Sequence, residues 1–463
     1  MNVVLFLIDD LGYRDVGAYN PDTFYETPNI DALARGGMRF TDGYAASPVC
    51  SPTRYSIMTG RYPSRVDATD WFTGRRVERF APAPLRDRMP LEEVTVAEAL
   101  RSAGYSTFFA GKWHLGPDAA WWPEAQGFDV NRGGHHRGSP PGPGRYFAPW
   151  ENPRLDAAAP GEFLTDRLAA ETADFVRGRG GEPFFAVMSL YSVHIPLMAP
   201  ADLVAKYEEK ARAASGSAAG PEFLEEEQVW PTDAPRQVRV VQSHPVYAAM
   251  VEAMDRAVGR VLDALDETGL ADRTAVFFVS DNGGLSTAEG LPTSNLPLRG
   301  GKGWLYEGGI RVPFLARVPG VTAAGSVSSA PVLTTDLYPT ILALAGLPAR
   351  PGQHLDGVSL LPVLEGGPPS DRDALFWHYP HYSNQGGFPG GAIRLGRWKL
   401  LERYEDGRVQ LHDLVEDLGE RTDLAQREPE RVADLRARLH AWYREVDARF
   451  LTARAGGPAP WAP

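Results

Sequence analysis

The chain contains a single cysteine, Cys50, and an arginine follows it four residues later as Arg54. Pro52 between them suits the first turn of a helix, so we expect Cys50 at the positively polarised N-terminal end of a helix. That position, with the charge of Arg54 nearby, lowers the pKa of a thiol and favours a nucleophilic thiolate. A lone cysteine without such surroundings is usually a small buried hydrophobic residue, and it cannot form a disulfide within the chain. The neighbouring chemistry therefore decides what Cys50 does.

Two further pairs of residues offer oxygen ligands for a metal ion, Asp9-Asp10 and Asp281-Asn282. Carboxylate and amide oxygens suit Ca2+ and Mg2+, and the residue types permit either ion. A thiolate prefers softer metals, so an unmodified cysteine beside such an ion would be chemically mismatched. Taken singly, each pair is equally good turn or helix-cap chemistry. Taken with Cys50, the pairs indicate that the cysteine is used in a modified form.

Four short apolar runs must position these residues, and they predict buried strands of a parallel sheet: Val3–Ile8, Thr107–Ala110, Phe184–Leu190 and Ala275–Val279. Polar side chains follow every run, in the order Asp9 and Asp10, Lys112 and His114, His194, and Asp281 and Asn282. In open parallel sheets, ligands bind beyond the carboxyl ends of the strands. We therefore expect these side chains to meet at one edge of the sheet.

Helical segments between the strands predict an α/β fold, with a large, mostly parallel central sheet covered by helices on both faces. The predicted helices are Ile30–Arg35, Val94–Ala103 and Tyr247–Thr268. The Gly- and Pro-rich segment Gly138–Pro160 and the polar segment Glu208–Ser243 are expected to be surface loops. We expect residues 1–370 to form the catalytic domain and residues 371–463 a smaller α+β subdomain. Its expected elements are short antiparallel strands at Ala374–His378, Gly391–Leu401 and Val409–Leu414 and a packing helix at Glu430–Phe450.

The composition restricts the classes of function. The formal net charge of −12 and the lack of a Lys/Arg run argue against nucleic acid as a partner. No apolar run is long enough to span a bilayer, and Val3–Ile8 leads directly into Asp9, unlike the apolar part of a signal peptide. We therefore expect no membrane partner. The expected location is cytoplasmic as the sequence stands, or periplasmic or secreted if its N-terminus has been trimmed.

Several motifs occur together, in one order, over nearly the whole chain. Cys50-x-Pro52-x-Arg54, with Thr59-Gly60-Arg61 after it, resembles the signature of the formylglycine-dependent (type I) sulfatases of the alkaline-phosphatase-like superfamily. Further segments resemble the family's other motifs, namely Asn2–Gly12, Thr27–Asp31, Gly104–Gly116, Ser280–Gly284, Gly300–Lys302 with Glu307–Pro313, and Arg397–Leu400. Within the superfamily the chain looks most like arylsulfatases and carbohydrate sulfatases.

The resemblance implies that a maturation enzyme oxidises Cys50 to formylglycine (3-oxoalanine), whose hydrated aldehyde supplies the nucleophile. It implies a divalent cation, Ca2+ with Mg2+ as the alternative, held by Asp9, Asp10, modified Cys50, Asp281 and Asn282. It also implies sulfate contacts or proton carriers at Arg54, Lys112, His114, His194 and Lys302. One hydroxyl of the hydrate would attack sulfur, and deprotonation of the other, by His114 in our interpretation, would expel sulfate. The proton for the leaving alkoxide would come from His194 or Lys302.

The implied activity is hydrolysis of a small sulfate monoester, expected on a carbohydrate, with artificial aryl sulfates also accepted. Aromatic rings stack on sugars, and histidine or arginine side chains bond to them, so the candidate sugar contacts are His136, Trp377, His378, His381 and Arg394. The alternative activity is that of a phosphodiester or phosphonate monoester hydrolase on the same scaffold. A glycan-binding protein without catalysis is the non-enzyme alternative, although no candidate catalytic position is substituted.

Overall fold

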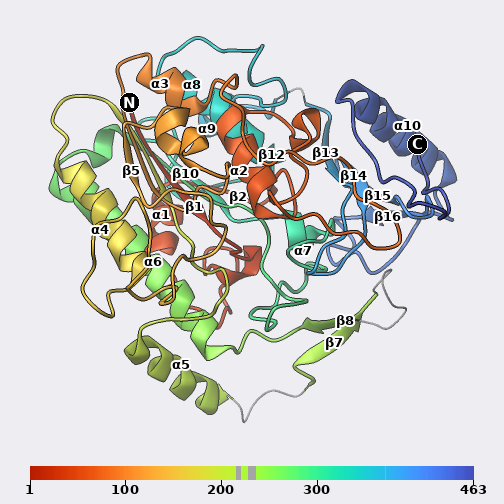
Figure 1. Cartoon of the computed structure of the whole chain (residues 1–463), viewed down its shortest axis with the longest axis horizontal. Helices are drawn as coiled ribbons and strands as arrows, with labels where there is room; N and C mark the ends of the chain where they lie inside the picture. Colours follow the sequence, from red (N-terminus) through yellow and green to blue (C-terminus); the bar gives the residue numbers. More distant parts are fainter. Residues whose placement is uncertain (215–219, 228–235, 371) are drawn as a thin grey trace.

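A sheet of eight strands forms the centre of the molecule (Figure 1). The structure is a computed structural model that describes residues 1–214, 220–227, 236–370 and 372–463. Within these residues all strand pairings of the sheet are parallel except those of β10, which runs antiparallel to both neighbours. In spatial order the strands are β11 (Ser326–Ser328), β2 (Met38–Phe40), β10 (Phe314–Arg317), β9 (Thr274–Ser280), β1 (Asn2–Ile8), β6 (Phe184–Ser189), β4 (Ser106–Gly111) and β5 (Val130–Arg132).

Helices cover both faces of this sheet, and a separate hydrophobic core lies under each set. Alternate side chains of β1 enter different cores, for example Phe6 on one face and Leu5 on the other. The strand is therefore apolar at every position that follows Asn2, as the uninterrupted run in the sequence indicates. The first core is covered by α1 (Pro28–Gly36), α4 (Leu164–Arg177) and α6 (Pro245–Glu267), with α5 (Ala201–Ala214) packed against α6. The second is covered by α2 (Cys50–Thr59), α3 (Val96–Arg101), α8 (Leu337–Leu344) and α9 (Leu361–Leu364).

A smaller antiparallel sheet and the last helix lie together at the right of Figure 1 and share a third hydrophobic core. The sheet contains β13 (Ala374–Tyr379), β14 (Gly390–Leu395), β15 (Trp398–Arg403) and β16 (Val409–Asp413), and the helix is α10 (Pro429–Glu445). Apart from short 3-10 helices, the remaining elements of the described residues are the short helix α7 (Glu307–Ile310) and two strand pairs, β3 (Gly43–Tyr44) with β12 (Val332–Leu333) and β7 (Phe223–Glu226) with β8 (Arg236–Arg239). Residue 371, where the sequence places the start of a subdomain, lies outside the described residues, so that division stays a prediction.

The predicted α/β fold is confirmed, and two predictions about single elements are wrong. The segment Gly391–Leu401 is not one strand, because Gly396 turns the chain with a φ of 57° and separates β14 from β15. The segment Glu208–Ser243 is not a simple loop, because its start continues α5 and its later part contains β7 and β8. Parts of that segment, residues 215–219 and 228–235, lie outside the described residues. In the described part of the chain, no helix combines the length and apolar character needed to cross a membrane.

Candidate active site

The carboxyl ends of four neighbouring strands form the site. β9, β1, β6 and β4 lie next to one another in this order and run parallel. Asp9 follows β1, Lys112 follows β4, and the Nζ of Lys112 lies 2.6 Å from Oδ2 of Asp9. The backbone nitrogen of Asp10 donates to Oδ1 of Asp281, which follows β9, at 3.3 Å. The predicted meeting of these side chains at one sheet edge is therefore confirmed.

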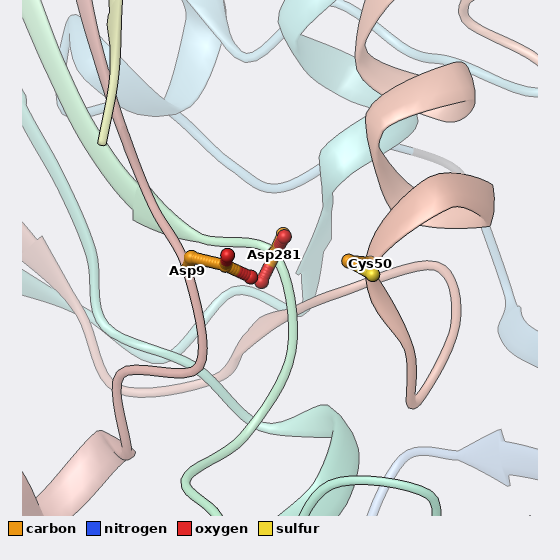
Figure 2. Close-up of side chains that lie close together, drawn as sticks. All are labelled: Asp9, Cys50 and Asp281. Carbon is orange, nitrogen blue, oxygen red and sulfur yellow. The ribbon is translucent and has the colours of Figure 1, made fainter. Parts of the chain in front are cut away.

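Cys50 is the first residue of α2, so the predicted position at a helix N-terminus is confirmed. Figure 2 shows its side chain beside those of Asp9 and Asp281, and its sulfur and one oxygen of each carboxylate lie within 4.8 Å of one another. The sulfur also lies 3.5 Å from Nδ1 of His114. Burial raises the pKa of the Cys50 thiol, although Lys112 opposes the change. This direction favours the neutral thiol and argues against a thiolate nucleophile.

The charged groups of the site are buried and paired with one another. Nε of Arg54 donates to Oδ2 of Asp281 at 2.8 Å, and a terminal nitrogen of the same guanidinium donates to the carbonyl oxygen of Lys112 at 2.7 Å. Nζ of Lys302 lies 2.8 Å from Oδ2 of Asp10. Burial alone would raise the pKa of Asp10, but Lys302, His194 and Lys112 together outweigh it and hold that pKa below its usual range. Such charges are kept inside a protein only when opposite charges or hydrogen bonds compensate their lost hydration.

Two histidines border these charges. Nδ1 of His194 lies 2.7 Å from the carbonyl oxygen of Ile195, which accepts a hydrogen bond, so this nitrogen carries the ring proton. The other ring nitrogen, Nε2, faces Oδ2 of Asp10 at 3.8 Å. Burial lowers the pKa of His194 to about 4, and burial together with Lys112 holds that of His114 well below its usual value. Both imidazoles are therefore neutral near pH 7 in this structure, which leaves each with a nitrogen that can accept a proton.

The backbone is left-handed at two of the site residues. Asp10 has a φ of 61° and His114 a φ of 59°. Side chains other than glycine adopt this region at a cost of order 1 kcal/mol or more, and residues that do so cluster at functional sites. Two such residues at the carboxyl edge of one sheet, after β1 and β4, indicate that the local backbone is shaped by the site as well as by stability.

The residues fit a divalent cation. Oδ1 of Asp9 and Oδ1 of Asn282 are buried and have no hydrogen-bond partner among the described residues. The amide nitrogen of Asn282 donates to Oδ1 of Asp10 at 2.8 Å, which leaves the amide oxygen available as a ligand. Burial raises the pKa of Asp9, and burial with the neighbouring Asp9 raises that of Asp281 to about 6. Crowded, unsatisfied oxygens of this kind are the ligands that Ca2+ and Mg2+ prefer.

A cavity of about 630 Å3 opens over the site. It is lined by Cys50, His114, His194 and Lys302 of the site and by residues from several other segments, which are 71–73, Arg76, Asp87, 116–117, 136–139, Glu289 and 384–385. His136, a sequence candidate for sugar contact, lines the cavity and stacks on Trp122 with ring centroids 6.4 Å apart. A volume of this size suits a small organic ligand.

The other four candidate sugar contacts do not line this cavity; each is buried and has a protein partner. Nε1 of Trp377 donates to the carbonyl oxygen of Ala45 at 2.8 Å. His378 is held between the Tyr404 hydroxyl at 2.6 Å and the Arg449 carbonyl at 2.8 Å, and His381 lies 2.7 Å from the Thr69 hydroxyl. Arg394 pairs with Asp42 at 2.7 Å. These side chains bind the core and the small sheet together.

Sequence reasoning missed several residues of the site. Ser189 ends β6, and its hydroxyl lies 2.6 Å from Arg54, so it helps fix the guanidinium. Glu289, Asn384 and Gln385 line the cavity, and the carboxylate of Glu289 accepts hydrogen bonds from both amide side chains. No motif marks Glu289, Asn384 and Gln385, because they reach the cavity from loops that only the tertiary fold brings together.

The fold and the site define the class of protein. Three buried carboxylates, an asparagine and Lys112 follow strands at the carboxyl edge of a mostly parallel sheet. Arg54 from α2 and Lys302 from a loop pair with these carboxylates, beside a cavity that is lined in part by a buried cysteine. Oxygen ligands for a divalent cation together with paired cations for an anionic group are the parts of a hydrolase that acts on anionic esters.

Comparison with known proteins specifies the family. The Sulfatase family model matches residues 1–347, and the model for the C-terminal part of N-sulphoglucosamine sulphohydrolase matches residues 301–448. A protein of Formosa agariphila named sulfatase is 32% identical to this chain over 95% of the chain and 88% of its own length. Arylsulfatase A of Homo sapiens is 35% identical over 86% of this chain and 74% of its own length. The chain belongs to the sulfatase family and is a sulfuric ester hydrolase.

A solved structure agrees with this assignment. The crystal structure of Ps i-CgsB in complex with k-i-k-neocarrahexaose superposes with a TM-score of 0.76 at 28% identity, over 95% of this chain and 92% of that one. The resemblance noted from the sequence motifs is thereby confirmed, as is the alkaline-phosphatase-like fold that it implies.

Proposed function

We propose that this sulfatase hydrolyses the sulfate monoester of a carbohydrate, with Cys50 in its formylglycine form and a divalent cation, Ca2+ in preference to Mg2+, at the adjacent carboxylates. The observation that carries the proposal is the position of the Cys50 sulfur, within 4.8 Å of carboxylate oxygens of Asp9 and Asp281. A thiol is a poor ligand for the hard cation that these carboxylates suit, whereas an oxygen atom at the same place would complete a set of oxygen ligands for that cation.

The modified residue would supply a hydroxyl of a hydrated aldehyde as the nucleophile towards sulfur. Its formation oxidises Cβ of Cys50 to an aldehyde with loss of the sulfur, so it requires a maturation enzyme and an oxidant that the enzyme uses. Cys50 is buried in the folded chain, with 4% of its surface exposed. We therefore propose that the maturation enzyme acts before this region has folded.

The cation would supply Lewis-acid polarisation and positive charge. Without it the site has equal numbers of opposite charges, from Asp9, Asp10 and Asp281 on one side and Arg54, Lys112 and Lys302 on the other. Such a neutral group has little attraction for an anionic ester, whereas a divalent cation makes it positive. We propose Asp9, Asp10, Asp281, Asn282 and modified Cys50 as the ligands.

The remaining residues would bind the sulfonyl oxygens and move protons. Lys112, Lys302 and Arg54 are preorganised by the buried pairs described above, so stabilising new charge costs little reorganisation. His114 contacts the Cys50 side chain, and its imidazole is neutral. It would therefore suit the role of base towards the hydrated formylglycine at residue 50. His194 and Lys302 both line the cavity and are the two candidates to give a proton to the leaving alkoxide. Lys302 is protonated beside Asp10, whereas His194 would first have to take up a proton on Nε2.

A carbohydrate substrate is supported by the related structure that contains neocarrahexaose and by the cavity over Cys50, whose lining includes charged and amide side chains. The test is a comparison of sulfated mono- and disaccharides, para-nitrophenyl sulfate and a para-nitrophenyl phosphodiester, scored as kcat/KM. We expect release of sulfate from at least one saccharide and from the aryl sulfate. A large preference for the phosphodiester would instead assign the alternative activity of a phosphodiester or phosphonate monoester hydrolase.

Removing the divalent cation is expected to lower both turnover and thermal stability. Three buried carboxylates then lose the charge that compensates them, and at an ion concentration a hundred times its Kd the lost stabilisation is about 2–3 kcal/mol. The measurement is the unfolding temperature and the sulfatase rate after treatment with a chelator, followed by titration with Ca2+ or Mg2+. We expect Ca2+ to restore both quantities at the lower concentration.

Chelator that has been saturated with Ca2+ beforehand is the control, because it contains the same reagent without removing the ion. An unfolding temperature that responds neither to the chelator nor to added ions would contradict the metal site. Full recovery with Mg2+ at lower concentrations than Ca2+ would reverse the proposed preference.

A further inference from the structure

Arg137 lines the active-site cavity, and its side chain is exposed there. Its guanidinium forms no hydrogen bond or ion pair with any residue that the structure describes. The other cations of the cavity differ, because Lys302 is paired with Asp10 at 2.8 Å and Arg76 with Glu78 at 3.5 Å. Arg137 is therefore the cation of the described cavity that is available to an anion from outside the protein.

The loop that carries Arg137 is fixed to the catalytic strand end. The backbone nitrogen of His114 donates to the carbonyl oxygen of His135 at 3.2 Å, and the nitrogen of Arg137 donates to Nδ1 of His135 at 3.1 Å. Burial lowers the pKa of His135 to about 3, so its ring is neutral and can accept that bond. Gly138 packs directly on His114, because a Cβ at Gly138 would lie 2.3 Å from the imidazole. The backbone of Arg137 is thus preorganised beside the reacting centre.

Arg137 is nevertheless distinct from the cations that surround the sulfate position. Arg54, Lys112 and Lys302 are buried, and each is held by a carboxylate of the site. Arg137 is instead exposed on the lining of the cavity. An exposed guanidinium in this position can meet a group of the substrate other than the sulfate that is hydrolysed.

The charges of the cavity wall are distributed unevenly. Glu289 lines the cavity and accepts hydrogen bonds from Asn384 and Gln385, which fixes its negative charge in the cavity wall. Asp87, the other carboxylate of the cavity, is neutralised by Arg88 at 2.8 Å. An additional anion on the substrate would be repelled near Glu289 and attracted near Arg137. Arginine also suits this task, because its planar guanidinium can bind carboxylate or sulfate through two parallel hydrogen bonds.

We propose that Arg137 binds a second anionic group, a carboxylate or another sulfate, on the saccharide whose sulfate ester is hydrolysed at residue 50. The inference rests on the proposed function and narrows its substrate class to saccharides with at least two anionic groups. Arg137 acts in this assignment as a specificity determinant and takes no part in the bond cleavage.

The test is Arg137→Gln, assayed with para-nitrophenyl sulfate, N-acetylgalactosamine monosulfates, the corresponding disulfates, and sulfated disaccharides that contain glucuronate. We expect KM for the doubly anionic saccharides to rise about tenfold, since a charge-assisted hydrogen bond contributes about 1.5 kcal/mol or more. The kcat for these substrates and both constants for the singly charged substrates should stay within about twofold. The disulfate and glucuronate arms show which anion Arg137 binds, and Arg137→Lys should recover part of the affinity.

Arg132→Gln is the matched control, because it removes the same charge five residues earlier, from a side chain that pairs with Glu171 and does not line the cavity. Formylglycine content and unfolding temperature are measured for every variant, so a change in KM is separated from a change in maturation or folding. The inference is overturned if Arg137→Gln affects singly and doubly charged saccharides equally, or affects neither. A wild-type enzyme with converted Cys50 that hydrolyses no sulfate ester would overturn the proposed function instead.

Discussion

Cys50→Ala is expected to lower the hydrolysis of para-nitrophenyl sulfate by more than about ten-thousand-fold, because it removes the atom from which the nucleophile is made. No other residue can replace it, since Cys50 is the only cysteine of the chain and lines the cavity. The fold should persist. The side chain is small, its sulfur contacts Nδ1 of His114 at 3.5 Å, and a change of this size costs about 1 kcal/mol of stability. Turnover and thermal unfolding of the purified variant test both statements.

Cys50→Ser is the matched control, because it keeps the size of the side chain and places a hydroxyl beside the same carboxylates. If this serine is sulfated, it cannot expel sulfate as a hydrate would, so we expect at most one turnover per site and a mass increase of one sulfuryl group. In wild-type preparations with different extents of conversion, the rate should follow the converted fraction measured by intact mass. Substantial activity of Cys50→Ala, or activity that follows total folded protein, would contradict the proposed nucleophile.

The main sheet could be predicted from the sequence because burial on both faces leaves a simple pattern. β1 and β9 are buried at every position, which requires uninterrupted apolar runs, and the polar residues after them mark the strand ends. The small sheet has no such pattern. Its β14–β15 hairpin turns at Gly396 within two residues, and the segment around that turn resembles one continuous strand. Local alternation alone cannot distinguish a long strand from a tight hairpin.

The centre of the site could also be predicted, because its residue types are costly to bury unless they act together. Asp9, Lys112 and Asp281 follow strand ends, and parallel topology brings those ends to one edge. The substrate contacts could not be predicted in the same way. Trp377 and His378 have the right chemistry for a sugar, but their hydrogen bonds to Ala45 and Tyr404 place them in the core. Residue type indicates what a side chain can do, whereas only the tertiary fold decides whether it faces a cavity.

Asp281→Asn is expected to lower turnover about a hundredfold or more and to lower the affinity for the divalent cation at least about tenfold. The variant keeps the shape of the side chain, removes the negative charge, and leaves the buried Arg54 without the carboxylate that its Nε contacts at 2.8 Å. The loss should therefore appear in three measurements, which are kcat, the concentration of Ca2+ that restores activity, and the rise in unfolding temperature that Ca2+ produces. A group that served only as a base would reduce kcat and leave both metal-dependent quantities unchanged.

Asp255→Asn provides a matched control for burial. Burial raises the pKa of Asp255 to about 6, as it does for Asp281, but Asp255 accepts backbone hydrogen bonds from Asn29 and Ile30 at the start of α1. Its replacement should cost about 1 kcal/mol of stability, as loss of a helix cap does, and should leave kcat and the Ca2+ response intact. If the two variants behaved alike, the effects at Asp281 would come from loss of a buried carboxylate in general. A Ca2+ response lost in Asp281→Asn alone would assign the cation to the carboxyl edge of the sheet, because the two residues differ in position and not in side-chain chemistry.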